Sequence, residues 1–199
     1  MDEILPGVWH WTTEHPSIHQ PVSSYYLEDA GALVDPLLPD GGADAFGDWA
    51  VQRIVLTCRH HRRHAPELRD RYGATVLVPR NGLHEFEGDP MQVEPYDPGD
   101  ELAPGVRALR LEAISPDDEV LHVHAGLGAL AFADGLVNLD GIGFVPDGLM
   151  DDPPTVKART IERLRELVEL DFDALLFAHG DPVPSGGRDA LQRFLSAHA

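Results

Sequence analysis

Residues 53–64 read Arg-Ile-Val-Leu-Thr-Cys-Arg-His-His-Arg-Arg-His. The first five, from Arg53 to Thr57, form a largely apolar, β-branched run that is typical of a buried strand. Cys58 comes next and is the one cysteine of the chain, and a cationic cluster of arginines and histidines follows it without a break. Polar side chains gathered at the end of a buried strand indicate a functional site, because loops at strand ends often carry function.

The composition makes this basic segment stand out. The chain has 199 residues, with 15 Lys+Arg against 34 Asp+Glu and a formal net charge of -19. Hydrophobic residues make up 43%, which is enough for a sizeable core and excludes wholesale disorder. A single cysteine excludes an internal disulfide framework and any multi-cysteine zinc site.

The charge and the lack of long apolar runs also bear on partners. Like charges repel, so the acidic chain disfavours nucleic acid and anionic membrane surfaces as partners. The acidic N-terminal residues show no signal-peptide pattern, and no stretch approaches the length of a spanning helix. We therefore expect a cytoplasmic protein with no nucleic-acid or membrane partner, and we leave the oligomeric state open.

Outward from this segment, strands and helices alternate. The pattern predicts strands at 4–11, 22–27, 32–34, 53–57, 75–78, 106–112, 119–124, 128–133 and 174–178, and one more near 91–93. It predicts helices at 65–72, 155–170 and 189–198, and a short one within 41–50. This order favours an α/β protein with two sheets flanked by helices, in a single domain over residues 1–199.

Several of these segments, taken in order, resemble the metallo-β-lactamase superfamily. They are the opening hairpin and its aspartate turn (22–27 and 33–36), the strand before the metal motif (54–57), the helix and strand after it (65–68 and 73–79), and the strands that lead to Asp134 (130–134) and His179 (175–180). The resemblance covers nearly the whole chain. It implies a four-layer αβ/βα sandwich and a metal-dependent hydrolase-like protein.

The first metal motif of this superfamily reads His-x-His-x-Asp-His. With Thr57 as the anchor, the corresponding residues are Cys58, His60, Arg62 and Arg63. His60 is unchanged and Cys58 can ligate as a thiolate, whereas a guanidinium stays protonated and offers no lone pair to a metal. This is the alignment that we favour.

A shift of one residue gives a second alignment. The motif positions are then Arg59, His61, Arg63 and His64. This alignment keeps two histidines, but it displaces Thr57 and still places an arginine at the aspartate position. Either alignment breaks the dinuclear metal site of the superfamily.

The later ligand positions are partly kept. Asp134 and His179 are present, whereas a later histidine of the family is lost. The resemblance therefore implies a degenerate metal site. It would hold one Zn, Fe or Mn ion through His60, Asp134 and His179, with Cys58 or His15 assisting.

Three interpretations stay open. In the first, a metal-bound water attacks an ester, thioester, amide or lactone, and Asp134 helps to hold the metal and the water. In the second, no metal is bound: Arg62 or Arg63 fills the place of the cation and pairs with Asp134, which leaves a non-catalytic pseudoenzyme that binds a small anion or acts as a regulatory module. In the third, the cationic cluster is a solvated loop with no role.

Further candidates surround the motif. Those for contact with a small-molecule substrate or anion are Arg62, Arg63, His61, His64 and His15. Asp35 resembles the superfamily aspartate that orients the loop backbone without touching the metal. Asp181 follows His179 closely and is placed to orient it.

Overall fold

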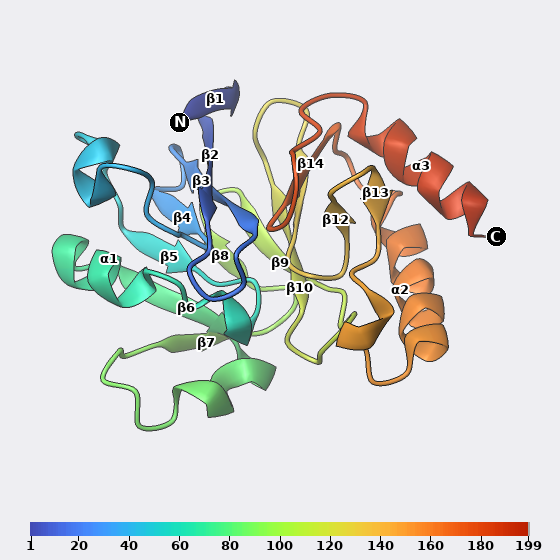
Figure 1. The fold of residues 1–199 in the computed structure, drawn as a ribbon. Helices are drawn as coiled ribbons and strands as arrows, with labels where there is room; N and C mark the ends of the chain where they lie inside the picture. The colour runs from blue at the N-terminus through green and yellow to red at the C-terminus, as the bar shows by residue number, and fades with distance from the viewer. Residues whose placement is uncertain (199) are drawn as a thin grey trace.

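A computed structural model describes residues 1–198 (Figure 1). The strands are β1 (Asp2–Leu5), β2 (Val8–Glu14), β3 (Pro21–Leu27), β4 (Ala32–Val34), β5 (Arg53–Val55), β6 (Thr75–Pro79), β7 (Glu94–Tyr96), β8 (Glu101–Ala103), β9 (Val106–Arg110), β10 (Glu119–Val123), β11 (Ala129–Phe132), β12 (Val137–Asn138), β13 (Ile142–Gly143) and β14 (Ala174–Phe177). The α-helices are α1 (Ala65–Tyr72), α2 (Pro153–Leu167) and α3 (Gly187–Ala197). The short 3-10 helices are η1 (Gly42–Phe46), η2 (Arg59–His61), η3 (Arg80–Phe86) and η4 (Asp147–Leu149).

Two sheets form the centre of the molecule. The first has the order β1-β2-β3-β4-β5-β6-β7 and the second the order β14-β11-β10-β9-β8, while β12 and β13 form a separate hairpin. Figure 1 shows α1 on the outer side of the first sheet and α2 and α3 on the outer side of the second. The architecture is the four-layer αβ/βα sandwich that the sequence predicts.

Four apolar clusters among residues 1–198 hold these layers together. Val55, Leu121 and Leu176 belong to the core that draws on both sheets. Ile54 packs with α1 on the other side of its sheet, so β5 is buried on both faces. Parallel strands covered on both faces need a continuous apolar run, which explains the sequence pattern of β5.

The sequence prediction was wrong for one strand. The strand expected near 91–93 is absent, and β7 and β8 occur instead at 94–96 and 101–103. Parallel pairing of β7 with β6 sets this position, a long-range effect that local pattern does not report. The short helix expected within 41–50 is present as the 3-10 helix η1.

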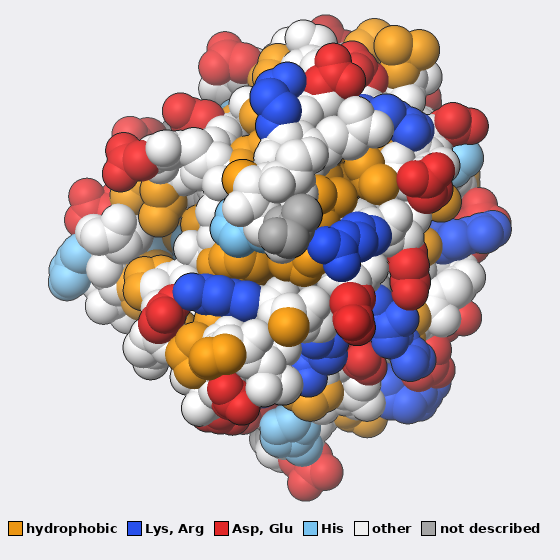
Figure 2. Space-filling view, turned by 90° about the vertical axis from the view of Figure 1, so that its right-hand side faces the viewer, with side chains coloured by type: hydrophobic (Ala, Val, Ile, Leu, Met, Phe, Trp, Pro, Cys, Tyr) orange, Lys and Arg blue, Asp and Glu red, His pale blue; other side chains and the backbone are white. Residues whose placement is uncertain are grey.

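The helices cover the outer faces. Figure 2 shows the side of α2 and α3, where acidic and basic side chains intersperse around exposed apolar atoms. The longest helix, α2, has 15 residues. Within residues 1–198, no helix combines the length and the apolar character that crossing a membrane requires.

The ends of three strands meet at one edge of the sandwich. Cys58 lies just after β5 of the first sheet, whereas Asp134 and His179 lie just after β11 and β14 of the second. Because β11 and β14 are parallel, they deliver Asp134 and His179 to the same edge. The fold thus brings together residues that are far apart in the chain.

Candidate metal centre

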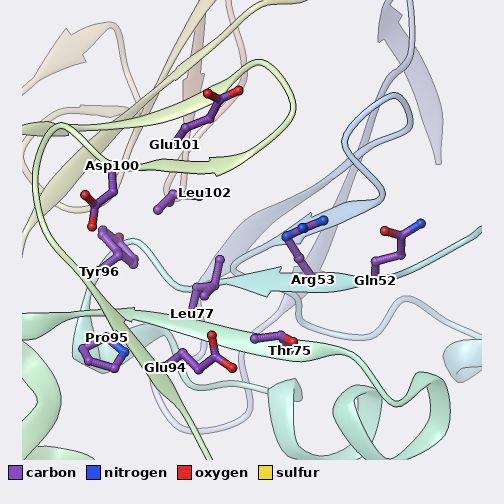
Figure 3. A pocket seen from close by; sticks show the side chains of 10 residues that line it. All are labelled: Gln52, Arg53, Thr75, Leu77, Glu94, Pro95, Tyr96, Asp100, Glu101 and Leu102. Carbon is purple, nitrogen blue, oxygen red and sulfur yellow. The ribbon is translucent and has the colours of Figure 1, made fainter.

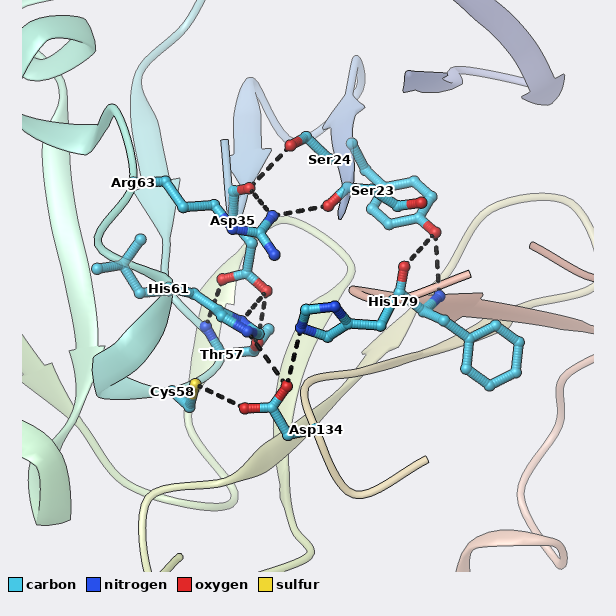
Figure 4. Close-up of polar contacts among 12 residues, drawn as sticks. Ser23, Ser24, Asp35, Thr57, Cys58, His61, Arg63, Asp134 and His179 are labelled. Carbon is cyan, nitrogen blue, oxygen red and sulfur yellow. Dashed lines mark hydrogen bonds and ion pairs between the residues drawn. The ribbon is translucent and has the colours of Figure 1, made fainter. Parts of the chain in front are cut away.

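Asp134 is the centre of a buried polar cluster (Figure 4). Its Oδ1 lies 3.4 Å from His61 Nε2 and 3.1 Å from His179 Nε2. The Cys58 thiol donates to its Oδ2 at 3.7 Å. Ligand atoms of Cys58, His61 and Asp134 all lie within 4.8 Å of one another.

Asp35 fixes the orientation of His61. The 3-10 turn η2 directs His61 inward, where its side chain is 5% exposed. His61 Nδ1 donates to Asp35 Oδ2 at 2.9 Å, so Nε2 faces Asp134. Asp35 also accepts the Thr57 N–H at 2.8 Å and the Thr57 hydroxyl at 2.5 Å, which joins the end of β5 to the same carboxylate.

Arg63 closes the loop over β3 and β4. Its backbone is left-handed, with a φ of 37°, and its Nη1 donates to the carbonyls of Ser23 (2.8 Å) and Asp35 (2.6 Å). Its Nη2 is buried and has no hydrogen-bond partner among residues 1–198. The guanidinium therefore supports the backbone at this edge of the sandwich with one nitrogen and leaves the other unused.

The charges in the cluster depend on one another. Burial disfavours the ionised form of Asp134, but the His61 charge and the hydrogen bonds of His179 and His61 together outweigh it and hold the pKa of Asp134 well below its usual range. Burial also disfavours a charged His61, yet Cys58, Asp35 and Asp134 together raise its pKa well above 6.5. Burial raises the pKa of the Cys58 thiol to about 12. In this arrangement an imidazolium lies between two carboxylates, beside a neutral thiol.

The donor set fits a metal ion. Thiolate, imidazole and carboxylate are the three ligand types that zinc takes in proteins, and ligand atoms of a tetrahedral site lie about 3.3–3.7 Å apart. The contacts of Asp134 with Cys58 and His61, at 3.7 Å and 3.4 Å, match that spacing. Asp35 supplies the carboxylate that metal-binding histidines usually have on their other nitrogen. In the described part of the chain, this is the one group of three or more such side chains close enough to share an ion.

The favoured alignment of the metal motif does not match the cluster. His60 is exposed and lies outside the group of ligand atoms, and its neighbour His61 takes the inner position. The reason is η2, which turns the chain directly after Cys58. The cluster thus combines Cys58 from the first alignment with His61 from the second.

The expected pairing of an arginine with Asp134 is also absent within residues 1–198. Arg62 binds Asp89 instead, through Nε at 2.8 Å and Nη2 at 3.2 Å. Arg63 is bound to backbone carbonyls, and Arg59 pairs with the buried Asp117. Two of the three arginines, Arg59 and Arg62, therefore form ion pairs with carboxylates of neighbouring loops.

The remaining candidates lie around the cluster. His64 accepts the Leu38 N–H through Nδ1 at 3.0 Å and stabilises the loop. His15 lies between β2 and β3, close to Arg63 and His179. Burial is the main cause that lowers the pKa of His15, and the charges of Arg63 and His179 lower it further. In the described residues Asp181 makes no side-chain contact with His179. It meets Asn138 through its backbone instead.

Asp118 is a residue that the sequence reasoning missed. It is fully buried just before β10, and its Oδ1 has no partner among residues 1–198. Burial, with the nearby charge of Asp134, raises the pKa of Asp118 to about 8. Three acidic residues in a row at 117–119 of an otherwise apolar segment were the available signal.

One cavity lies away from this cluster. Figure 3 shows a space of about 570 Å³ lined by residues that include Arg53, Thr75, Leu77, Glu94 and Asp100. Arg53 and Thr75 begin β5 and β6, whereas Cys58 follows the end of β5. The cavity therefore lies at the opposite end of these strands and shares no residue with the cluster.

Known structures share this arrangement of sheets and helices. No protein-family model matches the sequence, and no curated protein does. A metallo-beta-lactamase family protein from Thermus thermophilus superposes with a TM-score of 0.71 at 18% identity, over 98% of this chain and 80% of that one. The chain has a metallo-β-lactamase fold.

Two further structures with the metallo-β-lactamase fold are comparably similar. A beta-lactamase domain protein from Burkholderia ambifaria has a TM-score of 0.71 at 18% identity, over 99% of this chain and 75% of that one. A protein solved in a di-iron-bound form has a TM-score of 0.67 at 20% identity, over 90% of this chain and 96% of that one. At such low identity these similarities show the fold alone.

Proposed function

We propose that this chain is a hydrolase that uses one metal ion held by Cys58, His61 and Asp134. The observation that carries the proposal is the convergence of a thiol, an imidazole and a carboxylate within 4.8 Å at the strand-end edge of a metallo-β-lactamase fold. A single ion at this place, with one position left to water, is the arrangement of a catalytic rather than a structural site. Zn, Fe and Mn are the candidate ions.

Each residue of the cluster has a distinct task. The bound ion would polarise a carbonyl and lower the pKa of its water. Asp35 holds the Nδ1 proton of His61, so the lone pair of Nε2 faces the ion position. His179, whose side chain is 19% exposed, is more accessible than Asp134 at 12% and His61 at 5%. His179 is therefore the member of the cluster that an incoming substrate meets first.

The substrates of such a site carry an electrophilic carbonyl. An ester, a thioester, an amide and a lactone all offer an oxygen that a metal ion can polarise and a carbon that its water can attack. Asp134 would hold both the ion and the attacking water. The remainder of the substrate is recognised by the loops around the cluster.

A second candidate is a metal-free binding protein. The observation that favours it is His61, whose two nitrogens already face the carboxylates of Asp35 and Asp134. A protonated imidazole there takes the place of a metal cation between two buried acids, with Arg63 as a further positive charge. Such a site would bind a small anion without catalysis, and His61 would take the role that the sequence assigned to Arg62 or Arg63.

Metal analysis separates the two candidates. Protein purified without added metal is measured by elemental mass spectrometry, together with Cys58→Ser, His61→Ala and the matched neighbour His60→Ala. The hydrolase requires about one ion per chain, lost in His61→Ala, reduced in Cys58→Ser and retained in His60→Ala. A metal-free protein that takes up no added zinc would refute the hydrolase and support the binding protein.

A further inference from the structure

Arg63 carries an unused hydrogen-bonding group at the cluster. Both N–H groups of its Nη1 are accounted for by the Ser23 and Asp35 carbonyls. Its Nη2 is buried and has no acceptor among residues 1–198. Figure 4 shows the guanidinium reaching from its loop toward the space between Asp35 and His179.

Neighbouring arginines of the same loop do not share this property. Arg59 pairs with Asp117 and Arg62 with Asp89, so each has a carboxylate partner. Within the described residues Arg63 has no carboxylate within 4.0 Å. A guanidinium is always charged, and leaving one of its donors buried without an acceptor is unfavourable. An acceptor supplied from outside the chain would remove this cost.

We propose that Nη2 of Arg63 binds a carboxylate oxygen of the substrate. The proposal rests on the proposed hydrolase and specifies its substrates as carbonyl compounds that also bear a carboxylate. The anionic oxygen would lie beside His179, on the accessible side of the cluster. In a chain with a net charge of -19, the guanidinium of Arg63 offers an anion a fixed positive charge.

The charges around Arg63 favour a carboxylate over a phosphate. Nη1 is committed to two carbonyls, so of its two terminal nitrogens Arg63 can offer an outside anion only Nη2. Nη2 alone offers donors to a single oxygen. Asp35 and Asp134 are both ionised nearby, and their repulsion disfavours a dianion more than a monoanion.

The test uses 4-fluorobenzoate as a carboxylate probe, followed by fluorine NMR. The control ligand is 4-fluorobenzamide, which has the same shape without the charge, and the control variant is Arg62→Gln, which removes the adjacent arginine. We expect 4-fluorobenzoate to bind the wild type and Arg62→Gln equally and Arg63→Gln at least about tenfold more weakly, the effect of losing one charge-assisted hydrogen bond. Equal binding by Arg63→Gln, equal binding of the benzamide, or no binding of 4-fluorobenzoate at all overturns the proposal.

Two further arms close the remaining alternatives. Binding must persist after dialysis against EDTA, because its loss would show that a metal ion and not Arg63 holds the carboxylate. Inorganic phosphate must compete poorly, since strong competition would contradict the carboxylate assignment.

If Arg63→Gln does not fold, phenylglyoxal modification of the wild type replaces that variant. In this experiment 4-fluorobenzoate must slow the reaction of phenylglyoxal with Arg63 and leave its reaction with Arg62 unchanged. The metal content is measured separately, so failure here leaves the proposed hydrolase standing or falling on its own test.

Discussion

Zinc binding to the metal-free protein should release protons. The thiol of Cys58 has a pKa of about 12, and the pKa of His61 lies well above 6.5, so both ligands are protonated near pH 7.5 before the ion arrives. A metal ligand must be deprotonated. Asp134, whose pKa lies well below its usual range, is already ionised and releases nothing.

The magnitude follows from this count. One proton leaves Cys58 and one leaves His61, so about two protons are released per ion. The apparent affinity should then rise about 100-fold for each pH unit over the range in which both groups stay protonated in the metal-free protein. Cys58→Ser removes one of the two groups and should halve the release, whereas His60→Gln lies outside the cluster and should leave it unchanged.

Isothermal titration calorimetry measures this number directly. The observed enthalpy of zinc binding is plotted against the ionisation enthalpy of three buffers, and the slope gives the protons released. A slope near two in the wild type and in His60→Gln, falling to about one in Cys58→Ser, supports the assignment of ligands. A wild-type slope near zero, or the same slope in Cys58→Ser, would refute it.

Three other predictions concern stability. The folded state raises the pKa of Glu119 to about 8 and that of Asp118 to about 8, so it keeps protons that the unfolded chain releases. The stabilisation that these two groups contribute is therefore full below about pH 4 and is lost as pH rises toward 8, and Glu119→Gln should remove about half of that loss, measured against the wild type in urea titrations across this range. Asp35→Asn should lower the free energy of unfolding by about 3 kcal/mol, because a buried charged acceptor is lost, and a loss below about 1 kcal/mol in chemical denaturation would contradict this. Gly180→Ala should lower the free energy of unfolding by at least about 3 kcal/mol, since an added Cβ overlaps a backbone oxygen of β12. At Gly186 an added Cβ has open space, so Gly186→Ala should cost only the roughly 1–2 kcal/mol of its left-handed backbone. Equal shifts of the melting temperature for the two variants would contradict this prediction.

Much of the fold was predictable because strong local patterns lead directly to it. The apolar run of β5 and the short apolar strands β11 and β14 are each buried on both sides, and a polar residue lies two positions after the end of each. Two of these polar residues are Asp134 and His179. Their place at the edge that carries the cluster therefore follows from strand position alone.

The inner histidine could not be predicted in the same way. His60 and His61 differ by one position in a 3-10 turn, and contacts with the distant Asp35 select between them. The left-handed backbone of Arg63 closes that turn, and its two acceptors come from β3 and from the turn after β4. These are tertiary effects, and a spacing rule applied to one motif does not contain them.

The partners of the arginines illustrate the same limit. Arg62 meets Asp89 in a loop between η3 and β7, where the sequence shows no periodic pattern. Charge complementarity predicts that an arginine in such an acidic chain forms an ion pair with a carboxylate. It does not predict which of the 34 acidic residues lies within reach.

The cluster is assembled from both halves of the chain, and this has a consequence during synthesis. Cys58 emerges from the ribosome 76 residues before Asp134, at the end of a strand that the second sheet has not yet covered. Until β11 and β14 dock, the single thiol of the nascent protein is open to oxidants and stray metals. Docking of the second sheet brings Asp134 and His179 to Cys58 and also shields the thiol, so assembly of the cluster and protection of its one thiol are a single event.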